Sequence, residues 1–523
     1  MCVESVQGAN SVVDLATFNS GTLGYKLLGE NGIGSSMSSV VSVGDVNADG
    51  IDDFAIGAPY GDPLIRADAG IVHVIFGKTG LVTSAVDLLT YSSGSAGFRI
   101  FGAVAGDNCG WSLSSAGDVN HDGIADLIVG CRYADPPSRN NAGMAYVIFG
   151  HSMSTAFTDL DLASFTSGVK GFQILGAAAS DFLGRSVSGA GDFNGDGIDD
   201  VIVGADLADP FSRSSGGAAY IVYGHTTATA FTDIDLSTLT SGTTAQGMRI
   251  AGAVSGDTCG ISVSGAGDVN NDGIDDVVVG CFYADPLSRS EAGTAYIIYG
   301  KSTGLTNIDL ASFFSSGYGG RVLQGAAASD YFGNTVSAAG DVNGDGIADV
   351  VIGASNADPP GRNDAGITYV VFGASSTTVV TTDMASFVSG STGFKILGAA
   401  SNDVSGYFVS GAGDVNADGF DDMIVGALNA DPNSRNNAGA AYIIYGHSTS
   451  SPFTNIDLAT AVWGSVGVKI LGAVAGAGTG YSVGGGGDFN GDGVRDVLVG
   501  AYNEAISGRA VNGAVYLLYG VPP

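Results

Sequence analysis

The chain has 523 residues, of which 85 are Gly and only 14% are Asp, Glu, Lys or Arg. Its apolar content of 45% is enough for a large core and excludes a disordered chain. The net charge of −33 argues against nucleic-acid and anionic-membrane partners, because both need a positive protein surface. No apolar run approaches the roughly 18 residues that span a bilayer, so membrane insertion is not expected.

The first ten residues, MCVESVQGAN, lack the basic and apolar regions of a signal peptide. We therefore expect Met1 to stand at a mature or an engineered terminus, and the sequence leaves both alternatives open. A strand-like segment follows at 25–29. It matches the last strand of each later repeat, although it precedes the first acidic segment of the chain.

That acidic segment, GDVNADGIDD at Gly44–Asp53, recurs seven times with small changes. Its leading aspartates are 73 to 76 residues apart, so seven units of about 74 residues fill nearly the whole chain and leave no linker or second domain. A fixed period of this length is typical of repeat architectures. The leading aspartates are Asp45, Asp118, Asp192, Asp268, Asp341, Asp414 and Asp488.

Within each unit the order of elements is constant, as the third unit illustrates. A small-residue strand at 185–191 precedes the acidic loop, and an apolar strand at 200–205 follows it. A DPxxR loop, a strand at 217–224, a polar connection containing DLSTL and a last strand at 249–252 complete the unit. Four short β-rich segments per unit indicate one four-stranded antiparallel blade.

The sequence therefore predicts an all-β, seven-bladed β-propeller, with residues 1–523 as a single domain. Ser, Gly, Ala and Val dominate the strand before each acidic loop, as expected for an innermost strand crowded against a central axis. The last unit ends after its third strand, at 516–520, without a fourth. We expect 25–29 to complete blade seven with 479–520, because this closure leaves no open sheet edge.

Each acidic loop reads D-x-N-x-D-G-hydrophobic-x-D, a pattern that predicts a calcium site. Calcium takes six to eight oxygen ligands, and Gly at position 6 permits the sharp turn around the ion. Positions 1, 3, 5 and 9 supply side-chain oxygens and position 7 its backbone carbonyl. The predicted ligands are Asp45, Asn47, Asp49, Ile51 and Asp53; Asp118, Asn120, Asp122, Ile124 and Asp126; Asp192, Asn194, Asp196, Ile198 and Asp200; Asp268, Asn270, Asp272, Ile274 and Asp276; Asp341, Asn343, Asp345, Ile347 and Asp349; Asp414, Asn416, Asp418, Phe420 and Asp422; and Asp488, Asn490, Asp492, Val494 and Asp496.

Two other interpretations of the loops are less favoured. An EF-hand loop carries Glu at position 12, whereas every copy here has Ile or Val there. Asp, Asn and Gly also form ordinary turns, but seven intact copies of the same oxygen positions argue against turns alone. Seven calcium ions would change the net charge from −33 to −19. Magnesium is disfavoured because it prefers to keep its waters.

The repeated order G-x-S-V-S-G-A-G-D-x-N-x-D-G-x-x-D, V-x-V-G-A and G-x-A-Y-x-x-Y-G resembles the FG-GAP repeat of integrin-α propellers. Related repeats occur in bacterial extracellular proteins and some fungal lectins. The resemblance implies a seven-bladed ring, calcium in the hairpins between the first two strands, and extracellular adhesion or ligand binding. Integrins carry calcium in only some blades, have a shorter connection before the outer strand and often an inserted domain, so an integrin-type partner is not implied.

The DPxxR loops and the loops before the inner strands are expected on the face opposite the calcium loops. One interpretation is an Arg–Asp ring between neighbouring blades, and the other is a ligand face. The aspartate before the inner strand is replaced in units one and seven by Gly34 and Ala477, so we place candidate ligand-binding residues in that sector, at Arg66 and Arg509. The repeated residues are Arg66, Arg139, Arg213, Arg289, Arg362, Arg435 and Arg509, with Asp107, Asp181, Asp257, Asp330 and Asp403.

Four of the five cysteines form two pairs with the same spacing in units two and four. They are predicted to form the disulfides Cys109–Cys131 and Cys259–Cys281, which indicates an oxidising compartment. Buried free thiols are the alternative. Cys2 is left without an assigned partner.

No phosphate-binding loop or zinc-protease motif occurs, so we expect no enzyme. The leading hypothesis is a calcium-stabilised, secreted or cell-surface module that binds a glycan or an extracellular protein. One alternative is a structural protein that self-assembles into a surface layer, sheath or filament. The other is a calcium-dependent enzyme acting on polysaccharide or lipid.

Overall fold

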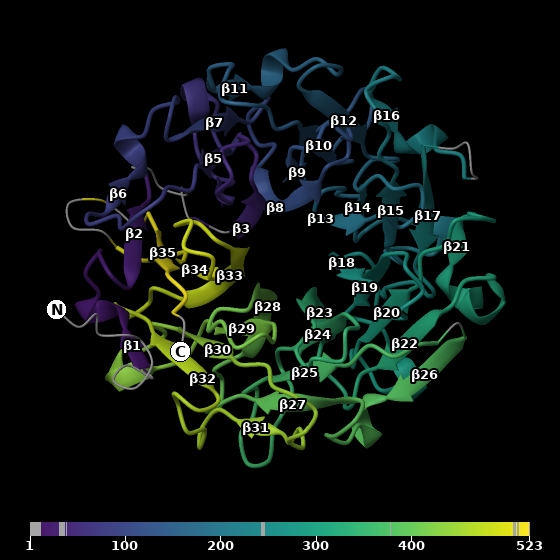
Figure 1. The fold of residues 1–523 in the computed structure, drawn as a ribbon. Coiled ribbons are helices and arrows are strands. Elements are labelled where there is room, and N and C mark those ends of the chain that lie inside the picture. Colours follow the sequence, from purple (N-terminus) through teal and green to yellow (C-terminus); the bar gives the residue numbers. More distant parts are fainter. Residues whose placement is uncertain are drawn as a thin grey trace.

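The computed structural model describes residues 12–30, 37, 39–241, 246–376, 378–505, 509 and 512–521. These residues form seven sheets arranged as blades around a central axis, as Figure 1 shows. The predicted seven-bladed propeller is therefore confirmed. Met1, Cys2 and Gly34 lie outside the described residues, and the predictions that concern them stay predictions.

The first four strands of each blade are antiparallel to their neighbours. They are arranged side by side, in chain order, from the central axis to the rim. The innermost strands are β3 (Ser39–Gly44), β8 (Cys109–Gly117), β13 (Ser186–Gly191), β18 (Ser262–Gly267), β23 (Phe332–Gly340), β28 (Ser405–Gly413) and β33 (Thr479–Gly487). The second strands are β4 (Asp53–Ala58), β9 (Asp126–Cys131), β14 (Asp200–Ala205), β19 (Asp276–Cys281), β24 (Asp349–Ala354), β29 (Asp422–Ala427) and β34 (Asp496–Ala501).

The third and fourth strands form the outer half of each blade and are given in the same order of blades. The third strands are β5 (Ile71–Ile75), β10 (Met144–Ile148), β15 (Ala218–Val222), β20 (Thr294–Ile298), β25 (Ile367–Val371), β30 (Ala440–Ile444) and β35 (Ala514–Leu518). The fourth strands are β7 (Gly97–Phe101), β12 (Gly171–Leu175), β17 (Gly247–Ala251), β22 (Gly320–Gln324), β27 (Gly393–Leu397), β32 (Gly467–Leu471) and β2 (Gly24–Leu28).

Each blade also has a fifth strand, which the sequence did not predict. It lies parallel to the fourth strand and comes from the DL-containing connection of the following unit. The chain thus pairs with the rim of one blade before it enters the next, and the exposed edge of the fourth strand is covered. The fifth strands are β11 (Leu160–Asp161), β16 (Ile234–Asp235), β21 (Ile308–Asp309), β26 (Val379–Asp383), β31 (Ile456–Asp457), β1 (Val12–Asp14) and β6 (Val86–Asp87).

Short 3-10 turns are the described helical elements. Six follow the fifth strands: η1 (Leu15–Thr17), η3 (Leu88–Thr90), η4 (Leu162–Ser164), η6 (Leu236–Thr238), η8 (Leu310–Ser315) and η9 (Met384–Ser386). Four lie in DPxxR loops: η2 (Pro63–Ile65), η5 (Pro210–Ser212), η7 (Pro286–Ser288) and η10 (Pro432–Ser434). Within the described part of the chain, no helix is long and apolar enough to cross a membrane.

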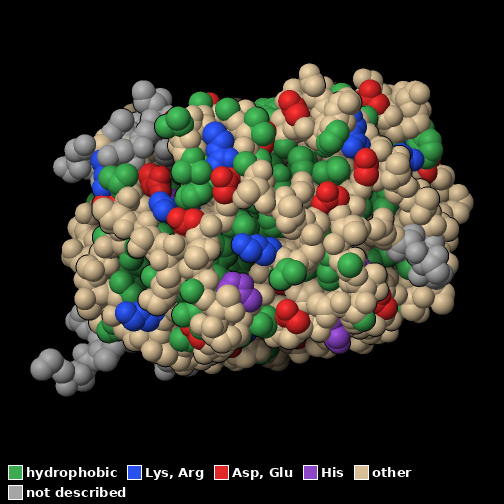
Figure 2. All heavy atoms as spheres, turned by 90° about the horizontal axis from the view of Figure 1, so that it is seen from above, with side chains coloured by type: hydrophobic (Ala, Val, Ile, Leu, Met, Phe, Trp, Pro, Cys, Tyr) green, Lys and Arg blue, Asp and Glu red, His purple; other side chains and the backbone are tan. Residues whose placement is uncertain are grey.

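The core lies between neighbouring blades rather than at the centre of the ring. All six residues of every second strand are buried, because each blade is sandwiched between two others. Small residues permit this close packing: a Cβ atom on Gly204 would lie 2.0 Å from the carbonyl oxygen of Gly260 in the next blade. Figure 2, an edge-on view of the disc, shows basic side chains lying beside acidic ones on the visible side.

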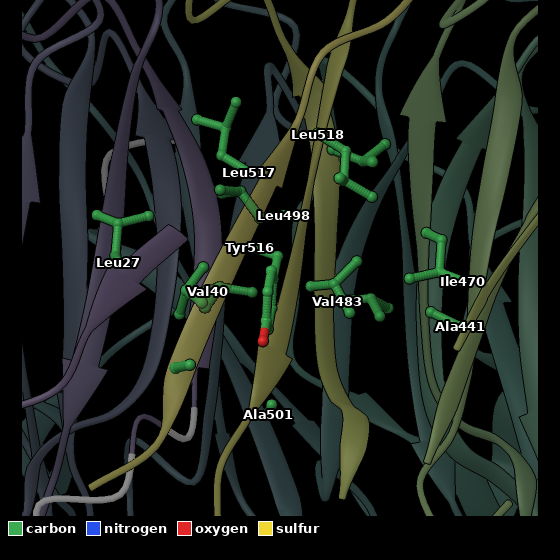
Figure 3. Close-up of a cluster of buried hydrophobic side chains, with 14 of the residues drawn as sticks. Leu27, Val40, Ala441, Ile470, Val483, Leu498, Ala501, Tyr516, Leu517 and Leu518 are labelled. Carbon is green, nitrogen blue, oxygen red and sulfur yellow. The ribbon is translucent and has the colours of Figure 1, made fainter. Parts of the chain in front are cut away.

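Both ends of the chain build blade seven. Strand β2 pairs antiparallel with β35, with Tyr25 opposite Leu517, and β3 packs against β33. Leu27, Val40 and Tyr516 belong to the same buried cluster, which Figure 3 shows. The predicted closure by an N-terminal strand is confirmed. The preceding strand, β1, pairs with β32 of blade six, so the N-terminal segment joins two blades.

Candidate functional site

The seven acidic loops are the hairpins that join the first and second strands. In each, a register shift near the end of the innermost strand places a Gly opposite the position-9 Asp, as for Gly44 and Asp53. The small residue and the bulge allow the two arms of the loop to separate around its centre. All seven loops therefore stand on the same face of the ring.

Backbone N–H groups orient the carboxylates inside each loop. In loop one, the carboxylate of Asp45 accepts hydrogen bonds from the N–H groups of Asp49, at 3.1 Å, and Gly50, at 2.7 Å. The Asp49 carboxylate accepts from the N–H of Ile51 at 3.0 Å. The same pattern recurs in the other six loops, for example around Asp488. The repeated sequence thus fixes one loop conformation in every blade.

The position-9 aspartate is buried at the base of the loop. Asp53 accepts from the N–H groups of Val46, at 3.0 Å, and Gly77, at 2.8 Å, which ties the loop to the end of the third strand. Burial raises the pKa of Asp53 to about 8, and the charges of Asp49 and Asp45 add to the increase. The loop therefore gathers carboxylates that repel one another.

Five of the seven position-3 asparagines carry a buried oxygen without a hydrogen-bond donor. In loop one, the amide nitrogen of Asn47 donates to Asp53, at 3.2 Å, while its Oδ1 atom has no hydrogen-bond partner among the described atoms. An orphaned buried acceptor costs free energy that a cation ligated by this oxygen would remove. The asparagines with an orphaned Oδ1 are Asn47, Asn120, Asn270, Asn343 and Asn490.

These observations fit a hard cation bound by oxygen. Among the described residues, no three His, Cys, Asp or Glu side chains are already grouped to hold a metal ion. The predicted ligand set of each loop is three Asp carboxylates, an Asn amide oxygen and a backbone carbonyl. The donor set and the orphaned oxygens fit calcium, and its presence remains a proposal.

Neighbouring loops also contact one another around the ring. The carboxylate at position 8 of one loop accepts from the position-1 N–H of the loop before it, as Asp199 does from Asp118 at 2.7 Å. Asp52 accepts from Asp488 at 2.9 Å and so joins the first and last blades. Asp275 and Asp421 make the equivalent contacts.

On the rim of the opposite face, the DPxxR arginines form seven ion pairs. Each arginine pairs with the aspartate at the end of the fifth strand of its own blade, a residue that the next unit supplies. We call these the outer ion pairs. They are Arg66–Asp161, Arg139–Asp235, Arg213–Asp309, Arg289–Asp383, Arg362–Asp457, Arg435–Asp14 and Arg509–Asp87.

The predicted Arg–Asp ring therefore exists with different carboxylates. Asp107, one of the expected partners, accepts from the N–H of Val104 at 3.0 Å, and its four equivalents do the same in their own loops. Six of the seven true partners begin 3-10 turns, and they were visible only as the Asp of a recurring DL in the connections, which is DM at Asp383. Arg66 and Arg509 both belong to outer ion pairs, so their ligand-binding role stays a prediction.

Both predicted disulfides are present. Cys109 lies directly opposite Cys131 on strands β8 and β9 and is bonded to it. Cys259 and Cys281 are bonded at the equivalent place in blade four. Each bond links the start of the innermost strand to the end of the second strand. The alternative of buried free thiols is therefore wrong.

Six segments match the family model of the FG-GAP repeat: residues 38–75, 110–148, 183–222, 332–371, 405–444 and 479–518. Each match starts at or next to an innermost strand and ends with the third strand of one blade. The chain belongs to the FG-GAP repeat family. Blade four, which lies between the third and fourth of these segments, carries the same motif, at Asp268–Asp276, and the same strands.

Curated relatives share the FG-GAP repeats over part of their length. Integrin alpha pat-2 of Caenorhabditis elegans is 31% identical over 47% of this chain and 18% of its own length. Integrin alpha-2 of Mus musculus is 32% identical over 33% of this chain and 13% of its own. Phosphatidylinositol-glycan-specific phospholipase D of Bos taurus is 36% identical over 22% of this chain and 13% of its own length. The chain therefore spans less than a fifth of the length of these relatives.

Proposed function

We propose that this FG-GAP propeller is a calcium-stabilised extracellular module that binds a glycan or protein ligand. The orphaned Asn Oδ1 atoms, each in a loop that also carries three aspartates at positions 1, 5 and 9, support the calcium part of the proposal most directly. The relation to integrin alpha chains supports adhesion or binding. Two disulfides support an oxidising, extracellular compartment.

In each loop the ion would be held by the side chains at positions 1, 3, 5 and 9 and by the carbonyl at position 7. In loop one these are Asp45, Asn47, Asp49, Asp53 and the carbonyl of Ile51. A bound cation would offset the carboxylate repulsion and satisfy the Asn47 oxygen. Because all five ligands lie in one hairpin, we propose a structural role for calcium rather than a switch between conformations.

Melting curves with and without a chelator test the calcium proposal. Ligand binding to the folded state alone stabilises by about 2.7 kcal/mol per site at 100-fold saturation. We expect a large fall in Tm on chelation, restored better by Ca²⁺ than by Mg²⁺. Asn47→Ala should lower the calcium stoichiometry by one, whereas Asn19→Ala, outside the loops, should not. An unchanged melting curve would refute structural calcium.

A glycan array and pull-downs with extracellular matrix proteins test the binding function. We expect ligand binding that disappears together with the fold on chelation. We propose no catalysis, since the similarity to the phospholipase D covers only 13% of that enzyme. Electron microscopy that showed the native protein only in layers or filaments, with no ligand on either screen, would favour the assembly role instead.

A further inference from the structure

The innermost strands of all seven blades enclose an open cavity on the propeller axis. Its volume is about 320 Å³, at the lower end of the roughly 300–1,000 Å³ typical of small-molecule sites. The lining includes Trp111, Arg185, Tyr407 and Tyr481 near the starts of their strands. Those starts lie away from the acidic loops, so this mouth of the channel opens on the opposite face of the ring. The centre of Figure 1 shows the ring of innermost strands.

Two arginines lie against the Trp111 ring: Arg185 lines the cavity, and Arg132 contacts the ring without lining the cavity itself. The guanidinium carbon of Arg132 is 4.2 Å from the centre of the Trp111 ring and 4.5 Å from that of Tyr133. The guanidinium carbon of Arg185, from blade three, is 5.5 Å from the same Trp111 ring. The corresponding positions after the second strand hold Pro59, Asp206, Phe282, Ser355, Leu428 and Tyr502 in the other blades. One sector of the regular ring is thus cationic.

These two positive charges are incompletely compensated. Among the described side chains, neither Arg132 nor Arg185 forms an ion pair, and Nε of Arg132 is buried without a partner. Burial, and then the charge of Arg185, lowers the pKa of Arg132. The nearby Asp206 supplies one negative charge, and its buried Oδ1 also lacks a partner. Two guanidinium groups therefore face one carboxylate in a protein of net charge −33.

The opposite side of the mouth is aromatic. The ring centroids of Tyr407 and Tyr481 are 5.8 Å apart, and that of Tyr502 is 4.5 Å from Tyr481. Burial raises the pKa of Tyr481 to about 12, and the charge of Arg185 opposes this increase from across the channel. Arg185, Trp111, Tyr407 and Tyr481 all line the same cavity of about 320 Å³, so one small ligand bound there would lie among them.

Below the mouth, the wall carries serine hydroxyls from blades three to six. Each donates its proton to the carbonyl of the next residue, at 2.7 to 2.9 Å, and so offers only lone pairs to a ligand. A sugar hydroxyl can donate to such an oxygen, whereas an ionised carboxylate side chain cannot. These serines are Ser188, Ser264, Ser337 and Ser410.

We propose that the channel mouth binds a carboxylate-bearing saccharide, such as a uronic acid residue, through Arg185, with Arg132 adding a second positive charge beside Trp111 and the sugar ring against Trp111 or Tyr481. Guanidinium groups recognise carboxylates with charge-assisted hydrogen bonds, and the apolar C–H face of a pyranose packs on aromatic rings. The serine lone pairs accept from sugar hydroxyls, which favours a saccharide over an acidic peptide. This inference rests on the proposed binding function and names its ligand class.

Calorimetry with the calcium-loaded protein tests the proposal. The probes are a panel of uronic acid trisaccharides, their carboxyl-reduced neutral counterparts, and a hexapeptide of Asp and Glu. We expect the acidic trisaccharides alone to bind, and Arg185→Gln to weaken binding about tenfold or more. Arg249→Gln is the matched control, because Arg249 also lies over an aromatic ring, Phe211 at 5.0 Å, but on outer strand β17. It should bind like the wild type.

A second measurement does not depend on the arginine variant folding. The chain has two tryptophans, and Trp463 stacks on Tyr442 near the rim. In a Trp463→Phe variant, Trp111 is the sole tryptophan reporter. Its emission should change with the acidic trisaccharides and not with the neutral ones.

Each contrary outcome overturns the proposal in a different way. If no acidic trisaccharide binds, or if the neutral ones bind equally well, the ligand class is wrong. If the peptide alone binds and depends on Arg185, the partner is an acidic protein segment. If array glycans bind equally to Arg185→Gln and wild type, the channel site fails while the proposed binding function stands.

Discussion

The guanidinium group of Arg139 donates to both carboxylate oxygens of Asp235, at 2.6 and 2.8 Å, across 96 residues of sequence. Asp235 also caps the η6 turn by accepting from the N–H of Ser237 at 2.9 Å. One aspartate thus fixes the fifth strand to the blade before it and starts the turn that leads into its own blade. All seven aspartates accept from the N–H two residues on, and the arginine donates to both carboxylate oxygens in the pairs of Arg139, Arg213, Arg289, Arg362 and Arg509.

Replacing Asp235 by Ala should lower the free energy of unfolding more than replacing Arg139 by Ala. The pair is partly exposed, so its coupling energy should stay below about 1 kcal/mol. Asp235→Ala also removes the cap, at a further cost of about 1 kcal/mol, whereas Asp235→Asn retains an acceptor for Ser237. Urea unfolding of the single and double variants measures the coupling. Equal losses for Asp235→Ala and Asp235→Asn would contradict the capping role.

Asp107 should make stability depend on pH in the range from about 4 to 6. Burial raises its pKa to about 6 in the folded state, above the ordinary value of 3.8. As the pH falls, Asp107 therefore takes up its proton at a higher pH in the folded state than in the unfolded chain. Above pH 6 the ionised carboxyl destabilises the folded state, by at most about 3 kcal/mol. Asp107→Asn should raise Tm at pH 7 and leave it unchanged below pH 4. The comparison is made in excess calcium to hold the acidic loops constant.

Deletion of residues 1–29 should open the ring. It removes β2 from blade seven and β1 from blade six, and exposes the edges of β35 and β32. Unpaired edge groups favour aggregation, so the product should self-associate or lose cooperative unfolding. Deletion of residues 1–11 is the control, since it retains both strands. A monomeric Δ1–29 protein with unchanged Tm would show that the N-terminal strands do not hold the ring closed.

Loss of one disulfide should lower stability without changing the fold. The Cys109–Cys131 bond closes a segment with a sequence separation of 22, for which chain entropy gives about 3 kcal/mol. The double variant Cys109→Ser, Cys131→Ala copies blade six, where Ser405 lies opposite Ala427. Its free energy of unfolding should fall by about this amount, and reduction of the wild type should cause a larger fall. No change in either case would mean that the bonds do not constrain the unfolded chain.

Much of this architecture could be predicted from local patterns. The period of the acidic loops gave the number of blades, and the missing fourth strand of the last unit predicted closure by β2. Cys109 and Cys131 occupy the same positions in their repeat as Cys259 and Cys281 do in theirs, and this equivalence predicted both disulfides. These features were readable because each depends on residues within one unit, or on the frame in which the units repeat.

The tertiary structure decided the features that depend on contacts between units. The fifth strand is as short as two residues, as in β16, and its parallel partner lies in the preceding blade, so no hairpin signal announces it. From the sequence, several aspartates could have been the partner of Arg139. Only the folded ring places Asp235 beside it. The cationic channel mouth likewise joins Arg132, Arg185 and Tyr481 from three blades. Long-range pairings of this kind have no local sequence pattern, because their geometry exists only once the ring has closed.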